Sequence, residues 1–378
     1  MTGPVHRLRA HLDELRLVDH HTHSVVRADL DRTGLEALLT EAHVPIPAVF
    51  DTPLGVAVRR WCAPVLDLPA HADAAAYVER RAELGRSEVT GRMLRASELD
   101  ALIVDIGFRP DELLDPASLG GAAGAAVHEV VRVESVAEEL ARAGVPARQF
   151  SSSYRDLLRD RSADAVGLKT IAAYRTGLDV PALRPTDDEV RGAAERWLST
   201  VESSGVARLD DPTLIGFAWW CAVDTGLPLQ VHTGFGDPDE TLRRADPACM
   251  QEFLDASAPV GTPIVLLHCY PYHRQAAYLA HVYPHVYFDV GLTTNYVGAS
   301  ARTVIAEAME LAPYGKFLYS SDAFGLPELH YLGAVLFRRS LAEVLAGWVD
   351  ADDMTLDDAL RYADLIGAGT ARTLYHLP

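Results

Sequence analysis

Short apolar runs rich in β-branched residues alternate with longer segments of helical periodicity along most of the chain. This alternation is typical of a parallel sheet whose strands are joined by crossover helices. Eight such runs predict eight strands, which favours a closed (β/α)8 TIM barrel over an open sheet. The predicted strands lie near residues 15–21 and at 101–108, 129–134, 165–171, 227–232, 263–268, 285–290 and 316–322.

Helical segments lie between most of these strands. The segment 187–205 has Thr186 in position to cap its first turn and a glycine at its end. Residues 24–100 are too many for a simple crossover, so they predict a helical insertion after the first strand, packed over the barrel mouth as part of the substrate pocket. Residues 327–378 predict helices that close the barrel. We expect one domain over residues 1–378.

The chain has 378 residues, with 34 basic and 53 acidic groups and a formal net charge of −19. Such a surface repels phosphate backbones and anionic membranes, which excludes nucleic acid and lipid as expected partners. The apolar runs are shorter than the ~20 residues of a membrane-spanning helix, and the first residues lack the apolar segment of a secretory signal. Four dispersed cysteines without a CxxC pair favour reduced thiols. These features predict a cytoplasmic protein.

Lysine is nearly absent. Of the 34 basic residues, only Lys169 and Lys316 are lysines, and all others are arginines. A guanidinium group cannot lose its proton at working pH, so arginine cannot perform amine chemistry. A retained lysine therefore marks either a site that needs an amine or a chance survival in an arginine-rich chain. Lys316 begins its predicted strand, at the opposite end of the barrel, and is expected to be a surface charge.

The densest chemical signal is Asp19-His20-His21-Thr22-His23, directly after the apolar run LRLV. Side chains two residues apart on a strand point to the same side, so His21 and His23 point one way and His20 the other. Two imidazoles aimed into a barrel mouth provide half of a metal site. The structural alternative is a polar strand end that faces water.

Four other predicted strands also end in a side chain that can bind a metal. The C-terminal ends of parallel strands converge on one face of a barrel, where barrel active sites are built. Five independent strand ends of this kind are hard to reach by chance, so the set predicts a metal site. The four further residues are Lys169, His232, His268 and Asp322.

Imidazole and carboxylate ligands without cysteine suit zinc, manganese or iron in an open catalytic site, and zinc is the first choice. The amine of Lys169 could react with CO₂ to give a carbamate, an anionic ligand able to bridge two ions, which arginine could not do. We therefore expect one or two divalent metal ions.

Longer motifs surround these positions: HTGFGDPD at 232–239, VLLHCYPYHRQAAYLAHVYPHVYFDVGL at 265–292 and LYSSDAFGLPELHYLGA at 318–334. Together they resemble the metal-dependent amidohydrolase superfamily, in its amidohydrolase-2 branch. The closest resemblance is to the amidohydrolase-like region of FluG/nodulin-type proteins, where it is fused to a glutamine synthetase-like domain. The resemblance covers the chain from about residue 15 onward, and we expect a stand-alone version without the synthetase domain.

The resemblance implies a role for each predicted ligand. His21 and His23, joined by Asp322, match the ligands of the more buried metal ion. Asp322 also matches the residue that takes a proton from metal-bound water and passes it to the leaving group. The lysine that bridges two ions when carboxylated corresponds to Lys169, and the ligands of the second ion correspond to His232 and His268.

Further polar residues lie near the same strand ends. Tyr174 and Arg175 are candidates to bind a substrate carboxylate, and the alternative for Arg175 is an ion pair with a structural carboxylate. Asp237 and Asp239 are candidates to bind a substrate amine or support a ligand, or else they cap their loop, and Asp237 is the one we select for substrate binding. Glu134, at the end of the third predicted strand, is either an acid that supports a ligand from behind or half of an internal ion pair with Arg132, and we favour the ion pair.

The combined pattern predicts a metal-dependent hydrolase that cleaves an amide or related C–N bond of a small polar metabolite by attack of metal-bound hydroxide. The resemblance to synthetase-fused proteins suggests γ-glutamyl amides as substrates. A non-oxidative decarboxylase of the same superfamily is the first alternative, and a non-catalytic binding domain is the second. The expected partner is a small molecule, with a homo-oligomer left open.

Overall fold

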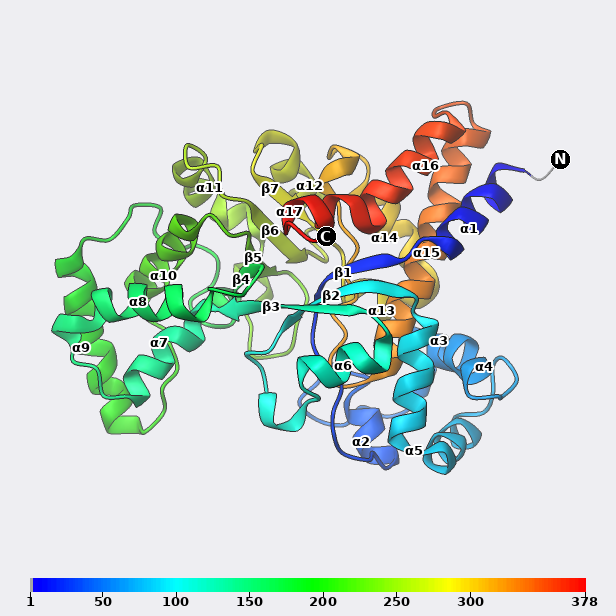
Figure 1. Cartoon of the computed structure of the whole chain (residues 1–378), viewed down its shortest axis with the longest axis horizontal. Coiled ribbons are helices and arrows are strands. Elements are labelled where there is room, and N and C mark those ends of the chain that lie inside the picture. Colours follow the sequence, from blue (N-terminus) through cyan, green and yellow to red (C-terminus); the bar gives the residue numbers. More distant parts are fainter. Residues whose placement is uncertain (1–2) are drawn as a thin grey trace. The chain divides into compact units, whose positions relative to one another are not determined.

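The computed structural model describes residues 3–378, which pack into two compact units (Figure 1). The first unit comprises the chain up to Val104 together with Phe108–His128 and Asp289–Pro378, and the second comprises Asp105–Gly107 and Glu129–Phe288. The first unit is therefore built from the two ends of the chain. Our expectation of a single domain stays a prediction.

Seven strands follow one another in chain order in the sheet. Five neighbouring strand pairs are parallel: β1–β2, β3–β4, β4–β5, β5–β6 and β6–β7. This is the TIM-barrel-like α/β arrangement that the alternating pattern predicts. The strands are β1 Leu17–Thr22, β2 Leu99–Asp105, β3 Ala126–Arg132, β4 Gly167–Thr170, β5 Leu229–Thr233, β6 Ile264–His268 and β7 Val286–Phe288.

The eighth predicted strand, 316–322, is not a regular strand, and this part of the prediction is wrong. The segment is nevertheless extended beside β1, because the His20 N–H donates to the Tyr319 carbonyl at 3.2 Å and the Asp322 N–H donates to the His21 carbonyl at 3.1 Å. The ladder is interrupted because the Ser321 N–H donates to the Asp19 side chain at 2.9 Å instead of to a backbone carbonyl.

Helices make up most of the remaining chain. In the first unit they are α1 Pro4–Glu14, α2 Arg32–Ala37, α3 Pro53–Ala57, α4 Ala63–Val65, α5 Ala74–Ala96, α6 Pro116–Ala123, α13 Thr293–Tyr296, α14 Ala301–Ala308, α15 Pro327–Asp350, α16 Leu356–Asp364 and α17 Thr370–Leu374. In the second unit they are α7 Val133–Arg142, α8 Phe150–Arg161, α9 Asp187–Ser204, α10 Pro212–Thr225, α11 Gln251–Ser257 and α12 His273–Val282.

Local sequence signals fix several helix ends. Thr186 forms a capping box with Glu189 at the start of α9, and Gly205 ends that helix in the left-handed region at φ 72°. A glycine is favoured there because it carries no Cβ to clash. The prediction for the ends of this helix is confirmed.

The segment between β1 and β2 carries helices α2 to α5, and residues 327–378 carry α15 to α17. Apolar side chains of the first segment form one buried cluster with those of α15. The cluster includes Tyr77 and Met93 of α5 and Leu329 and Leu336 of α15. Burial of this apolar surface stabilises the first unit. The proposed place of residues 24–100 over a barrel mouth stays a prediction.

Among residues 3–378, none of the helices combines the length and the apolar character that a membrane crossing requires.

Candidate functional site

Three predicted ligands come together in the first unit, at the end of β1 and of the extended segment beside it. The Nε2 atom of His21 lies 3.2 Å from the Asp322 Oδ1 atom, and the Nε2 atom of His23 lies 3.6 Å from the same oxygen. One donor atom from each side chain lies within 4.8 Å of the other two. His21 is buried, while His23 and Asp322 keep a small exposed fraction, 13% and 10% of their side chains. The group is therefore reachable from solvent on one side.

A buried hydrogen-bond network holds the residues between these ligands. The Ser321 hydroxyl donates to Asp19 Oδ2 at 2.5 Å and also accepts the Ala323 N–H at 3.1 Å. Thr22 Oγ1 lies 3.2 Å from Ser321 Oγ. Burial raises the pKa of Asp19 to about 7, against the opposing effect of the Ser321 hydrogen bonds. Because Thr22 and Ser321 are the immediate neighbours of the ligands, this network orients all three ligands.

His20 points away from this group, as the strand alternation predicts. Its Nε2 atom lies 2.9 Å from Asp289 Oδ2, and its Nδ1 atom lies 3.2 Å from the Tyr375 hydroxyl. His20 and Asp289 are both fully buried. The sequence reasoning missed Asp289, although its position just after β7 parallels that of Asp322 and could have drawn attention to it.

Aromatic rings lie beside the exposed edge of His23. The ring centroids of Phe324 and Phe108 lie 5.8 Å and 6.3 Å from that of His23, and 5.1 Å from each other. The guanidinium of Arg109 lies 5.6 Å from the Phe324 ring. These rings give the open side of the group an apolar wall, which the sequence reasoning did not find.

The other three predicted ligands lie in the second unit, on neighbouring parallel strands. Lys169 is on β4 and is 2% exposed, His232 is on β5, and His268 ends β6. The rings of His232 and His268 have centroids 4.7 Å apart. The six predicted ligands thus form two groups of three, one in each unit.

Glu240 is a further acidic side chain at this second group. Its Oε2 atom lies 3.2 Å from His232 Nε2, and its side chain is only 4% exposed. The Tyr174 ring lies 4.5 Å from the His232 ring between centroids. Glu240 ends the stretch GFGDPDE, in which the sequence reasoning singled out the two aspartates instead.

The remaining candidates of the second unit have local partners. Arg175 forms an ion pair with Glu138 at 3.3 Å. Asp237 accepts the backbone N–H of Asp239 at 2.8 Å, which is a turn-capping arrangement.

The expected pairing of Glu134 with Arg132 is wrong. Arg132 forms its ion pair with Asp105 at 2.5 Å. Glu134, fully buried, instead accepts hydrogen bonds from the Thr170 hydroxyl at 2.5 Å and the Ile171 N–H at 3.1 Å. Burial raises the pKa of Glu134. These bonds fix the backbone directly after Lys169.

Lys316 is also less exposed than a surface charge would be. Partial burial lowers its pKa to about 8.

Two of the six predicted ligands have a backbone conformation that side chains rarely adopt. Asp322 has φ 46° and His268 has φ 68°. A non-glycine residue in the left-handed region costs about 1–3 kcal/mol and persists only where its surroundings hold it there. Such positions cluster at functional sites, and here each lies at the end of an extended segment, β6 for His268 and the segment beside β1 for Asp322.

The chain matches the family model described as Amidohydrolase over residues 125–377. It belongs to the amidohydrolase family. It is also 34% identical to Protein fluG of Emericella nidulans over 247 residues, which make up 60% of this chain. That match spans only 28% of the length of fluG, so the chain corresponds to about a quarter of that protein.

Solved structures resemble the whole fold. A protein of Lactobacillus casei ATCC 334, provisionally assigned as a metal-dependent hydrolase, is 28% identical, with a TM-score of 0.85 over 98% of this chain and 97% of its own. A uronate isomerase of Bacillus halodurans C-125 is 14% identical, with a TM-score of 0.67 over 100% and 98% of the two chains. The second likeness shows the fold alone.

Proposed function

We propose that this protein is a metal-dependent hydrolase that cleaves an amide or related C–N bond. The observation that carries the proposal is the close group of His21, His23 and Asp322 at the strand ends of the first unit. Family membership and the 28% identical relative, itself provisionally assigned as a metal-dependent hydrolase, support the same activity class.

The donor set of this group fits a divalent metal ion. Two imidazole nitrogens and one carboxylate oxygen lie within 4.8 Å of one another, and no thiolate takes part. This chemistry suits an open site for zinc, manganese or iron, and we propose zinc. When bound, such an ion polarises a carbonyl and makes a water molecule more acidic.

Asp322 is proposed as the general acid–base. Its Oδ1 atom faces both imidazoles, and the side chain keeps a 10% exposed fraction through which a substrate proton can reach it. The carboxylate accepts the proton of the attacking water and then donates it to the nitrogen of the leaving amine. His21 and His23 hold the ion, and the buried Asp19–Ser321 contact keeps the Asp322 backbone in place.

Lys169, His232 and His268 are proposed as ligands of a second ion. Addition of the Lys169 amine to CO₂, with loss of one proton, would give a carbamate, an anionic oxygen ligand that arginine could not supply. Lys169 is 2% exposed and lies on β4, next to the strand that carries His232, which supports its place among these ligands. Glu240 beside His232 adds an oxygen donor to the same group.

The proposed substrates are small amides, with γ-glutamyl amides the first to screen because of the likeness to part of fluG. Tyr174, which packs on His232, is the best placed of the predicted substrate-binding residues. We retain Arg175 and Asp237 as substrate-binding candidates, although both have partners within the second unit.

The deciding experiment is the metal content of purified protein after loading, for the wild type, Lys169→Ala and the control Lys316→Ala. Two ions per chain, reduced in Lys169→Ala alone, support the bridged hydrolase. One ion in all three proteins contradicts the carbamate bridge and favours the decarboxylase. Release of CO₂ instead of an amine would then identify the decarboxylase. Failure to bind any ion would overturn the proposal.

A further inference from the structure

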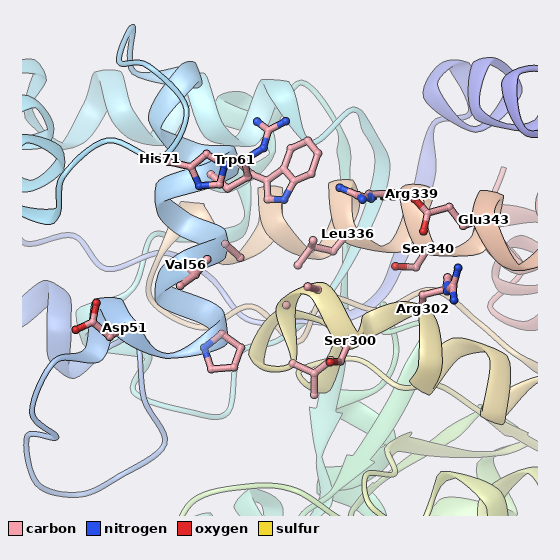
Figure 2. A pocket seen from close by; sticks show the side chains of 16 residues that line it. Asp51, Val56, Trp61, His71, Ser300, Arg302, Leu336, Arg339, Ser340 and Glu343 are labelled. Atoms are coloured by element: carbon pink, nitrogen blue, oxygen red, sulfur yellow. Dashed lines mark hydrogen bonds and ion pairs between the residues drawn. The ribbon is translucent and has the colours of Figure 1, made fainter.

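A cleft of about 550 Å³ lies in the first unit, and none of the predicted metal ligands lines it. Its walls come from α3 and the π-helical turn that follows it, from the chain just before and at the start of α14, and from the middle of α15 (Figure 2). A volume of this size is typical of sites for small organic molecules. The cleft has no role in the proposed hydrolysis.

One end of the cleft offers hydrogen-bond donors that the protein itself does not use. Arg302 has neither an ion pair nor a side-chain hydrogen bond within residues 3–378. Ser340 is only 5% exposed, and its hydroxyl likewise has no hydrogen-bond partner in that part of the chain. The Ser340 hydroxyl borders the cleft and is accessible from it, so a bound molecule can accept its proton. Figure 2 shows both side chains at the end of the cleft opposite Asp51.

The charge of the lining is positive although the whole chain carries −19. Three arginines face two carboxylates there: Arg60, Arg302 and Arg339 against Asp51 and Glu343. Glu343 is already held by Arg339 at 3.0 Å and by Arg9 at 3.3 Å. The lining therefore has a surplus of one positive charge, which matches a ligand with a single negative charge better than a dianion.

Apolar side chains make up part of the remaining lining. Val56 and Leu336 line its middle, and the indole of Trp61 adds an aromatic wall. The Trp61 ring is held in place by two guanidinium groups, that of Arg60 at 4.3 Å and that of Arg339 at 5.5 Å from its centroid. A ligand that fills the cleft needs an apolar body next to its charged group.

We propose that this cleft binds a small monocarboxylate with a planar apolar body. The guanidinium of Arg302 donates to the carboxylate, where arginine can form two parallel hydrogen bonds, and the Ser340 hydroxyl donates a third. The apolar body packs on Leu336, Val56 and Trp61. The proposal is independent of the hydrolase activity, since the two sites share no residue.

The test is isothermal titration of the full-length protein with benzoate as the probe. We expect one benzoate per chain, with an affinity at least tenfold lower in Arg302→Gln and several-fold lower in Ser340→Ala. Arg148→Gln, which removes an exposed arginine of the second unit, is the matched control and should leave the affinity unchanged. Neutral benzamide should bind at least tenfold more weakly, and inorganic phosphate should not displace benzoate.

Carboxylates also bind metal ions, so the titration is repeated after chelator treatment and in His21→Ala/His23→Ala. Unchanged binding in both supports the cleft as the site. The proposal is overturned if benzoate does not bind, if Arg302→Gln binds it as well as the wild type does, or if binding disappears with the metal or with the two histidines. It is also overturned if benzamide or phosphate competes equally with benzoate.

Discussion

Arg81 and Glu328 form an ion pair in the interior of the first unit, with Arg81 Nε 2.7 Å from Glu328 Oε1 and the two side chains only 7% and 0% exposed. The Tyr77 hydroxyl donates to the same carboxylate oxygen at 3.0 Å. Arg81 and Tyr77 belong to α5, and Glu328 lies in the first turn of α15, six residues after Asp322. The contact therefore ties α5, within residues 24–100, to the chain segment that carries Asp322.

Arg81→Met should lower the free energy of unfolding by about 3–5 kcal/mol, because it leaves the buried carboxylate of Glu328 without its counter-charge. Urea denaturation measures the effect. The double variant Arg81→Met/Glu328→Gln should recover part of the loss, since it removes the uncompensated charge. If the free energy of unfolding of Arg81→Met lies within about 1 kcal/mol of the wild-type value, this account of the ion pair is contradicted.

Asp322→Asn should reduce kcat at least about 100-fold on any amide that the wild type hydrolyses, because the amide side chain cannot accept the proton of the attacking water. Metal content, measured alongside, should also fall since a carboxylate ligand is lost. Asp357→Asn, an exposed position at the start of α16, is the control. Equal kcat values for Asp322→Asn and the wild type would remove Asp322 from the proposed mechanism.

Glu134→Gln should flatten the pH dependence of stability. Because burial raises the pKa of Glu134 in the folded protein, the folded state binds its proton more tightly than the unfolded state does. Stability contributed by the protonated form is therefore lost as the pH rises above about 4.5 through the folded pKa. Denaturation midpoints between pH 5 and pH 9 should fall less steeply in Glu134→Gln. A slope identical to that of the wild type would show that Glu134 does not titrate in this range.

Removal of metal should lower the thermal midpoint, because an ion that binds only the folded state stabilises it by mass action. Zinc at 100 times its dissociation constant corresponds to about 2.7 kcal/mol. Differential scanning calorimetry of chelator-treated and zinc-loaded protein measures the shift. The shift should be much smaller in His21→Ala/His23→Ala, and an undiminished shift in that variant would place the ion elsewhere.

Much of the fold could be predicted because each strand and helix has a local cause. Apolar β-branched runs gave seven of the eight expected strands, and Thr186 with Glu189 determined the start of α9. The eighth run, 316–322, has the same apolar character but pairs irregularly with β1. Its Ser321 N–H bonds to Asp19, a residue about 300 positions away, and no local pattern reports such a contact.

The alternation of side chains along β1 predicted which histidines would share a side, and the structure agrees: His21 and His23 face Asp322, while His20 faces Asp289. Partners from distant parts of the chain were harder to foresee. Arg132 was expected beside Glu134 but pairs with Asp105 on the preceding strand, since cross-strand neighbours compete with sequence neighbours for the same charge.

The sequence by itself determined the family, the parallel α/β pattern and the types of side chain at the strand ends, because these depend on local periodicity and residue chemistry. Tertiary structure alone decided which donors meet within 4.8 Å, which rings border His23 and that Arg302 and Ser340 share one cleft. Those relationships join positions tens to hundreds of residues apart. They depend on how strands and helices pack, which the order of residues along the chain does not display.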